Sequence, residues 1–230
     1  MLLAIPSLLT SDQVAEVRRL VDGGRWVDGK ATAGRQSALA KDNLQIAADC
    51  ERGLEAGRIV TRALSANGLF LSAALPRAMV PPLFNRYDGE HGHAFGNHVD
   101  NAIRFLPDGA GAIRTDLSAT LFLSAPEDYD GGELVIEDSY GAHEVKLAAG
   151  DMILYPSSSL HRVEPVTRGR RVASFFWIES RVREDSRRAI LLDMDAAIRS
   201  LAEALGDERA EVVSLTGCYH NLLREWASGG

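Results

Sequence analysis

Cysteine is scarce in this sequence, and long apolar runs are absent. Two cysteines, Cys50 and Cys218, stand in 230 residues, too few for a disulfide framework, so we expect a reducing, cytoplasmic environment. No apolar run approaches the roughly 20 residues that a membrane-spanning helix needs. The apolar residues 1–6 lack a basic start, and Asp12 follows them too soon for a signal peptide. We therefore expect a cytoplasmic protein without a membrane partner.

The sequence also has fewer basic than acidic residues. Lys and Arg number 25 against 32 Asp and Glu, which gives a formal net charge of −7. An acidic chain lacks the basic surface that sequence-independent nucleic-acid binding requires, so we expect no nucleic-acid partner. The remaining composition, 46% hydrophobic and 25% charged, is ordinary for a globular protein.

Helical spacing marks the N-terminal part of the chain. Thr10 and Gln13 have the spacing of a capping box and predict a helix that ends at Gly23. Apolar periodicity predicts a second helix over residues 46–66.

Helical spacing returns after residue 180. One helix is predicted over residues 183–205 and another up to about residue 226. Gly206 separates the two, and Asp207 is the expected cap of the second. The sequence leaves open whether this pair packs on the rest of the chain or joins a second copy in a homo-oligomer.

Short apolar segments separated by Gly-rich turns fill the middle of the chain. Strands are predicted over residues 69–75, 78–87, 98–105, 117–124, 133–138, 143–148, 152–155, 160–166 and 171–179. Such a series indicates an all-β sandwich or barrel. We divide the chain into N-terminal helices and supporting strands (1–77), a β core (78–180) and a helical extension (181–230). The turn-rich residues 107–111 are expected to form a flap over the site.

Two histidines and one aspartate have the pattern of a metal site. On a strand, side chains two residues apart point to the same face, so a strand over residues 98–105 would aim His98 and Asp100 into one space. His161, from a distant strand, would complete two histidines and one carboxylate. This set is the facial triad of non-haem Fe(II) oxygenases, which leaves other positions open for substrate and dioxygen.

A predicted hairpin adds Arg171 to the same face. A three-residue loop over residues 167–169 would end at Gly169, where the left-handed region favours glycine. This register pairs His161 with Phe175 and sets Arg171 on the face of His161, roughly 13 Å away along the strand. A guanidinium there suits a small dicarboxylate between itself and the metal.

Further motifs accompany these residues along nearly the whole chain. They are Pro82-Leu-Phe-Asn-Arg-Tyr87, His98-Val-Asp-Asn, Arg114-Thr-Asp-Leu-Ser-Ala-Thr-Leu-Phe-Leu123, Asp130-Gly-Gly-Glu-Leu134, Gly150-Asp-Met-Ile-Leu-Tyr-Pro-Ser-Ser-Ser-Leu-His161, Arg170-Arg-Val-Ala-Ser-Phe-Phe-Trp177 and Tyr219-His-Asn-Leu-Leu-Arg-Glu-Trp226. Together they resemble the Fe(II)/2-oxoglutarate-dependent dioxygenases, and most closely the bacterial PKHD-type hydroxylases of the prolyl/lysyl hydroxylase branch.

The resemblance implies a mainly β fold with flanking helices. Its core would be a double-stranded β-helix (jelly-roll), with N-terminal helices and a C-terminal helical pair. The resemblance assigns His98, Asp100 and His161 as iron ligands, and Arg171 as the partner of the distal carboxylate of 2-oxoglutarate. Related hydroxylases carry a tyrosine three residues before the first ligand, where this chain has Phe95.

The resemblance also implies the reaction. Such hydroxylases couple the oxidative decarboxylation of 2-oxoglutarate by dioxygen to hydroxylation of a substrate, and ascorbate commonly keeps the iron ferrous. The substrate, a small molecule or a peptide, is left open. An association with bacterial iron uptake and homeostasis is a hypothesis from the resemblance alone.

Other interpretations stay open at this point. A His-x-Asp motif alone is typical of a surface ion pair. The chain could also be a non-enzymatic β-helix sensor of a metal or small acid, or a cupin-like zinc or manganese enzyme. Arg170 is the second candidate for binding the distal carboxylate of 2-oxoglutarate, and Arg114 is a candidate for contact with the substrate. Tyr87 is a candidate to replace the tyrosine hydroxyl that Phe95 lacks.

Overall fold

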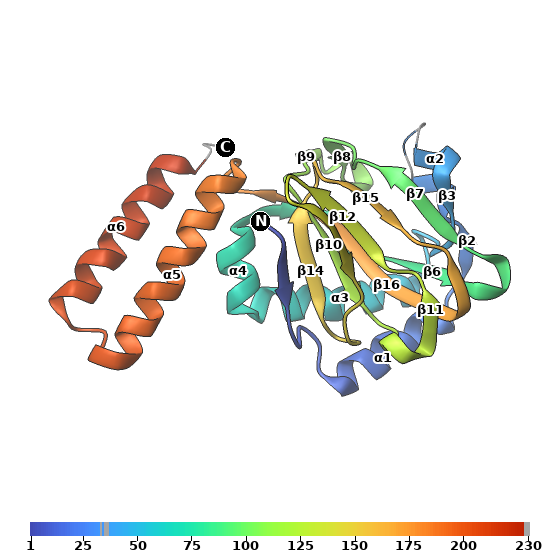
Figure 1. The fold of residues 1–230 in the computed structure, drawn as a ribbon, viewed down its shortest axis with the longest axis horizontal. Coiled ribbons are helices and arrows are strands. Elements are labelled where there is room, and N and C mark those ends of the chain that lie inside the picture. The colour runs from blue at the N-terminus through green and yellow to red at the C-terminus, as the bar shows by residue number, and fades with distance from the viewer. Residues whose placement is uncertain (33, 35–36, 228–230) are drawn as a thin grey trace.

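Two antiparallel sheets form the centre of the protein (Figure 1). The computed structural model describes residues 1–32, 34 and 37–227. The larger sheet contains β1 (Leu3–Ile5), β2 (Trp26–Asp28), β4 (Leu44–Ile46), β5 (Pro76–Met79), β6 (Leu83–Asp88), β10 (Leu117–Phe122), β11 (Tyr129–Gly131), β14 (Met152–Pro156) and β16 (Val166–Ser180). The smaller sheet contains β3 (Lys41–Asp42), β7 (Ala94–His98), β12 (Leu134–Asp138), β13 (Gly141–Val145) and β15 (Leu160–Val163).

Strands β8 (Ile103–Phe105) and β9 (Ala112–Arg114) pair only with each other among the described residues. The α-helices are α1 (Ser11–Asp22), α2 (Ser37–Ala40), α3 (Glu51–Ala66), α4 (Gly68–Ala74), α5 (Asp185–Leu205) and α6 (Ala210–Trp226). Short 3₁₀ helices span Gly29–Thr32, Gly89–His91, Pro107–Gly109 and Pro126–Asp128. None of the described helices combines the length and apolarity that crossing a bilayer would take.

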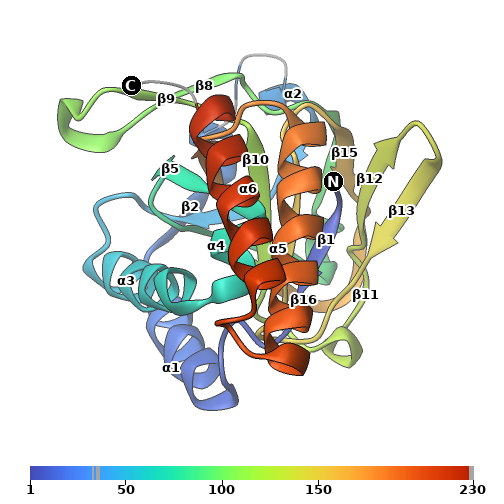
Figure 2. The ribbon, with the colours of Figure 1, turned by 90° about the vertical axis from the view of Figure 1, so that its left-hand side faces the viewer.

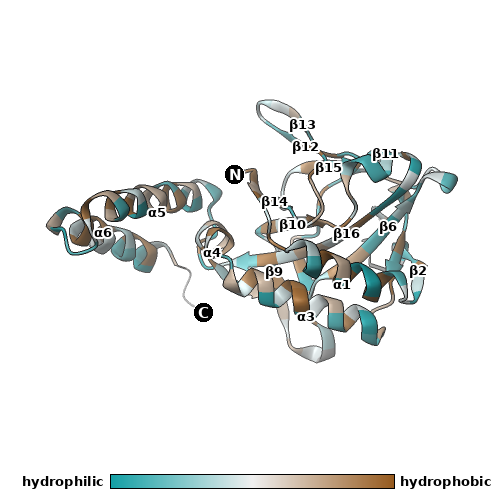
Figure 3. Cartoon of the chain, turned by 90° about the horizontal axis from the view of Figure 1, so that it is seen from below, coloured by the Kyte–Doolittle hydropathy of each residue, from teal (hydrophilic) through white to brown (hydrophobic). Residues whose placement is uncertain are grey.

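The alternation of side chains along β10 shows how the layers are organised. Leu117, Ala119 and Leu121 pack into a core cluster that they share with helices α1, α3 and α4. These helices cover the outer face of the larger sheet (Figures 2 and 3). Phe122 points the other way, into a second cluster that strands of both sheets line. The pocket that contains His98, Asp100 and His161 therefore lies between the two sheets, on the face of β10 that carries Ser118.

Helix α1 begins and ends at the residues that the sequence predicts. The backbone N–H of Gln13 donates to Thr10 Oγ1 (3.3 Å), and the N–H of Thr10 donates to Gln13 Oε1 (2.9 Å), so the predicted capping box is confirmed. Gly23 is the C-cap, as predicted.

The C-terminal helical pair is confirmed, with one correction. Helices α5 and α6 lie side by side at one end of the molecule (Figure 1), and Gly206 ends the first at φ +94°. Asp207 is not the cap of α6, because that helix begins later and Arg209 takes the N-cap position. Whether the pair joins a second copy stays a prediction.

Two N-terminal expectations are wrong. Residues 69–75 are not a strand. Residues 69–74 belong to helix α4, and Leu75 is its C-cap, because Asn67 Oδ1 accepts the N–H of Phe70 (2.8 Å) and starts a new helix. The helix predicted over residues 46–66 begins only at Glu51, because residues up to Ile46 pair with β6 and β2 as strand β4.

The strand predicted over residues 98–105 is broken. Strand β7 ends at His98, and β8 starts at Ile103 in a separate hairpin. Asp100 therefore lies in the connecting segment and not on the strand of His98. The turn-rich residues 107–111 connect β8 to β9 as expected, and their closure over the site stays a prediction.

The predicted hairpin between β15 and β16 is wrong as well. The two strands belong to different sheets, so His161 pairs with Ile136 and His98 and not with Phe175. Gly169 does take a positive φ (+69°), but it lies inside β16. A Cβ there would overlap the carbonyl oxygen of Asp128, so this glycine permits close approach of a neighbouring segment.

Candidate active site

Strand pairing brings His98 and His161 together. The two residues are directly opposite each other across β7 and β15, and their ring centroids lie 4.1 Å apart. Nδ1 of His98 lies 2.8 Å from the carbonyl oxygen of Gly96, and Nδ1 of His161 lies 3.0 Å from that of Ser159. A carbonyl only accepts, so Nδ1 carries the proton in each ring. In the neutral rings, Nε2 is then the atom with a lone pair for a metal.

Asp100 completes the cluster from the segment that follows β7. One ligand atom from each of His98, Asp100 and His161 can be chosen so that all lie within 4.8 Å of one another. Nε2 of His161 is 3.7 Å from Asp100 Oδ2. Among the described residues, this is the one group of His, Cys, Asp and Glu with such spacing. Two imidazoles and one carboxylate are the donor set of the Fe(II) facial triad, so the residues present fit that ion.

Hydrogen bonds hold the Asp100 carboxylate in place. Ser118 Oγ donates to Asp100 Oδ2 (2.6 Å), and Ser118 Oγ also lies 2.7 Å from Ser157 Oγ. Sequence analysis missed this support. Its signal was present in strand β10, where the polar residues Ser118 and Thr120 share the face opposite to Leu117.

Aromatic rings enclose the two histidines. Phe95 stacks on His98 with centroids 3.6 Å apart and an interplanar angle of 15°, and Tyr155 meets His161 edge-on at 5.2 Å. Burial, with the nearby His161, lowers the pKa of His98 to about 4. The imidazole of His98 is accordingly neutral at physiological pH.

Arg171 projects into the same pocket from β16. Its side chain shares a face of that strand with Phe175 and Trp177, because residues four and six positions apart on a strand point the same way. Only 1% of the residue is exposed, and its Cζ lies 5.4 Å from the ring of Tyr87 and 5.2 Å from that of Phe122. Burial raises the pKa of Tyr87 to about 12, so this neighbour is an uncharged phenol.

Nε and Nη2 of Arg171 have no hydrogen-bond acceptor within the part of the chain that the structure describes. A buried cation with unused donors is costly, since its hydration is lost without replacement. A ligand carboxylate would accept two parallel hydrogen bonds from such a fork. These orphaned nitrogens therefore fit the distal carboxylate of a bound dicarboxylic acid.

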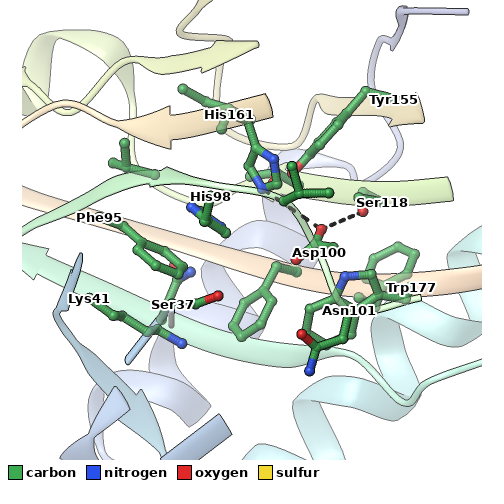
Figure 4. A pocket seen from close by; sticks show the side chains of 18 of the residues that line it. Ser37, Lys41, Phe95, His98, Asp100, Asn101, Ser118, Tyr155, His161 and Trp177 are labelled. Carbon is green, nitrogen blue, oxygen red and sulfur yellow. Dashed lines mark hydrogen bonds and ion pairs between the residues drawn. The ribbon is translucent and has the colours of Figure 1, made fainter. Parts of the chain in front are cut away.

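One pocket thus joins all four residues predicted for the site (Figure 4). The figure labels three of them, His98, Asp100 and His161, around a common space. The pocket wall also includes Lys41 and Arg104, which sequence analysis did not single out. No motif marked Lys41, because its strand has only two residues and therefore shows no apolar alternation.

Other candidates point elsewhere. Arg170 has a 62% exposed side chain, and its Nε lies 2.8 Å from Asp88 Oδ1, outside the pocket. Arg114 forms a bidentate pair with Asp116 (2.6 and 2.8 Å), and neither residue lines the pocket. Tyr87 does line it.

The comparisons with known proteins agree with this geometry. Residues 82–179 match the 2OG-Fe(II) oxygenase superfamily, and residues 185–228 match the PKHD-type hydroxylase C-terminal domain. A PKHD-type hydroxylase of Phenylobacterium zucineum (strain HLK1) is 60% identical over 227 residues, which cover 99% of each chain. A second, of Caulobacter vibrioides, is 59% identical over 227 residues with the same coverage.

Solved structures share the fold. A Pseudomonas putida prolyl-4-hydroxylase has a TM-score of 0.50 at 24% identity, covering 78% of this chain and 92% of its own. A Trichoplax adhaerens prolyl hydroxylase, solved with a peptide of hypoxia inducible factor, has a TM-score of 0.55 at 18% identity, covering 82% and 86%. The expected jelly-roll core with flanking helices is thereby confirmed. The chain belongs to the PKHD-type hydroxylase family and is a 2OG-Fe(II) oxygenase.

Proposed function

We propose that His98, Asp100 and His161 hold a single Fe(II), and that Arg171 binds the distal carboxylate of 2-oxoglutarate. The chain would use this site to hydroxylate its substrate. One observation carries the proposal. A single pocket contains a ligand triad with atoms within 4.8 Å of one another and a buried guanidinium with two unsatisfied nitrogens.

Each residue then has a defined task. His98 and His161 present Nε2, because both Nδ1 atoms are engaged by carbonyls. Asp100 presents a carboxylate whose orientation is set by Ser118. Arg171 fixes the far end of the co-substrate by two parallel hydrogen bonds. When bound, iron and 2-oxoglutarate would supply the oxidising chemistry with dioxygen, and the partly buried Phe95 and the buried Tyr155 would limit the access of bulk water to it.

The test begins without oxygen. Fe(II) is added to metal-free protein, then 2-oxoglutarate, and the weak visible charge-transfer band of the chelate is recorded. Oxygen is then admitted, and succinate is assayed. We expect a band that decays as succinate forms. Iron bound at the three residues without a band would contradict the proposal and support the non-enzymatic sensor instead.

The finer assignments rest on the family resemblance. We propose that ascorbate keeps the iron ferrous, so turnover in repeated cycles should fall when ascorbate is omitted. A role in bacterial iron uptake would be tested with a panel of siderophores and peptides. Coupled hydroxylation of an unrelated metabolite alone would contradict it. Cytoplasmic location, division of the chain at residues 77 and 180, and homo-oligomer formation stay predictions.

A further inference from the structure

Asn85 contributes a buried amide to the pocket. It comes from β6, only 7% of the residue is exposed, and it lines the pocket together with Tyr87, two residues further along the strand. Its Oδ1 accepts no hydrogen bond within the part of the chain that the structure describes, and the amide of Gln45, directly opposite on β4, does not donate to it. A buried amide oxygen without a donor is costly, so we expect a ligand to meet this side chain.

Strand pairing places Asn85 beside Arg171. Tyr87 is directly opposite Arg171 across β6 and β16, and Asn85 is directly opposite Ala173. Asn85 and Arg171 are therefore diagonal neighbours on one face of the sheet, which puts their Cα atoms roughly 7–8 Å apart and both side chains within reach of one small group. Both residues line the pocket, and both carry buried polar atoms without a partner in the described chain.

The same register places Asn85 on the side of Arg171 that faces the metal ligands. Ser118, the donor to the aspartate ligand, is directly opposite Trp177, six residues after Arg171 on β16. Ala173, the partner of Asn85, is two residues after Arg171 in the same direction. A dicarboxylate that extends from Arg171 to the metal ligands therefore passes the level of Asn85.

The chemistry of an amide suits this position. A carboxylate only accepts hydrogen bonds, and its two oxygens have about four acceptor sites, of which a guanidinium fork uses two. Half a turn about χ2 exchanges Oδ1 and Nδ2 of Asn85 within nearly the same volume, and no donor in the described chain holds Oδ1 where it is. In the turned orientation, Nδ2 can donate to a carboxylate oxygen at a site that Arg171 leaves free.

We infer that Asn85 donates through Nδ2 to the distal carboxylate of 2-oxoglutarate and shares that group with Arg171. The carboxylate then has a charged contact on β16 and a neutral contact on β6. The inference rests on the proposed function, because it assumes that 2-oxoglutarate extends from Arg171 to the metal.

The experiment uses the full chain without oxygen, saturated with Fe(II). The visible band of the iron chelate is titrated with 2-oxoglutarate and with 2-oxopentanoate, which has a methyl group in place of the distal carboxylate and can chelate iron through the same atoms. Asn85→Ala should weaken 2-oxoglutarate about tenfold, as the loss of one charge-assisted hydrogen bond would give. It should change the Kd of 2-oxopentanoate by no more than about twofold, because this probe offers Nδ2 no distal acceptor.

Asn85→Asp distinguishes a hydrogen-bond donor from a side chain that only fills space. Aspartate has nearly the shape of asparagine, but its carboxylate cannot donate to 2-oxoglutarate, repels it and competes for Arg171. N85D should therefore weaken 2-oxoglutarate about 100-fold, more than N85A does. Asn221, exposed on α6, provides matched controls, and N221A and N221D should leave both Kd values unchanged. Fe(II) affinity is measured in every variant and should not change.

The outcomes separate this inference from the proposed function. If 2-oxoglutarate forms no chelate band with the wild type, the proposed function fails. If the band forms and N85A binds 2-oxoglutarate as tightly as N221A does, Asn85 does not contact the co-substrate, and the inference alone is wrong. If N85A weakens both probes or Fe(II) to the same extent, or if N85D binds 2-oxoglutarate as well as N85A does, the side chain only supports the pocket wall, and the inference is overturned as well.

Discussion

The two ends of the pocket differ in how many hydrogen-bond partners the chain itself provides to the side chains there. At the metal end, each predicted ligand already has a second contact that orients it. Gly96 and Ser159 accept from the histidines, and Ser118 donates to Asp100. At the guanidinium end, Nε and Nη2 of Arg171 are buried without an acceptor in the described chain.

This difference indicates two modes of ligand recognition. The metal end is prearranged, so iron binding should require little movement of side chains. The guanidinium end carries a cost in the free protein, which a bound carboxylate removes. Co-substrate affinity should therefore depend on one residue more sharply than iron affinity depends on any supporting residue.

The largest expected effect comes from removing a ligand at the metal end. Asp100→Ala should reduce succinate formation to background, because two histidines alone leave the iron without its anionic ligand. The side chain lies at the pocket, and its removal takes away the hydrogen bond from Ser118 but no apolar core side chain, so the melting temperature should change little. Iron content and succinate are measured, with exposed Asp193→Ala as the control. Full iron loading with normal turnover would contradict the ligand assignment.

The guanidinium end should respond next. Arg171→Met should raise the Kd of 2-oxoglutarate about 100-fold, since breaking a buried charge pair costs roughly 3 kcal/mol. Iron should still bind, and the free protein should lose little stability, because two of the lost donors had no acceptor. Arg170→Met, which alters the exposed neighbour, is the control. Equal co-substrate affinity in both variants would remove Arg171 from its assigned role.

Sequence alone identified which residues line the pocket better than how the chain brings them together. The residue types of His98, Asp100, His161 and Arg171 could be identified, and the structure places all four in one pocket. The routes proposed for their convergence were wrong, because both assumed regular strands. The break after His98 and the crossing of the chain between sheets before Val166 depend on long-range pairing, which local periodicity does not encode.

Local signals were reliable where the physics is local. The capping box of Thr10 and Gln13 is complete within four residues, so the sequence contains all its parts. Asn67 shows the limit of such signals. It follows the helix predicted to end at residue 66 and is the C-cap of that helix, yet its side chain also caps the next helix. The same residue type can therefore mark the end of one helix and the beginning of another.

A smaller effect at the metal end would test whether it is prearranged. Ser118→Ala removes the donor to Asp100 Oδ2 and should weaken Fe(II) binding about tenfold, the usual scale for a partner of a metal ligand. Equilibrium metal competition measures the change, and exposed Ser158→Ala is the control. The Kd of 2-oxoglutarate should stay within about twofold once iron is saturating. Unchanged iron affinity would show that Asp100 is oriented without Ser118.

The smallest effect concerns the ring that stacks on His98. Phe95→Leu keeps an apolar group but removes the flat surface that lies 3.6 Å from the imidazole. We expect Fe(II) affinity to fall about threefold, in line with a stacking contribution near 0.6 kcal/mol. The visible spectrum of the Co(II)-substituted protein would report the changed ligand geometry, and Phe105→Leu, at an 84% exposed position, is the control. If affinity and spectrum both stay unchanged, the Gly96 carbonyl alone orients His98, and the metal end is prearranged by hydrogen bonds without help from aromatic packing.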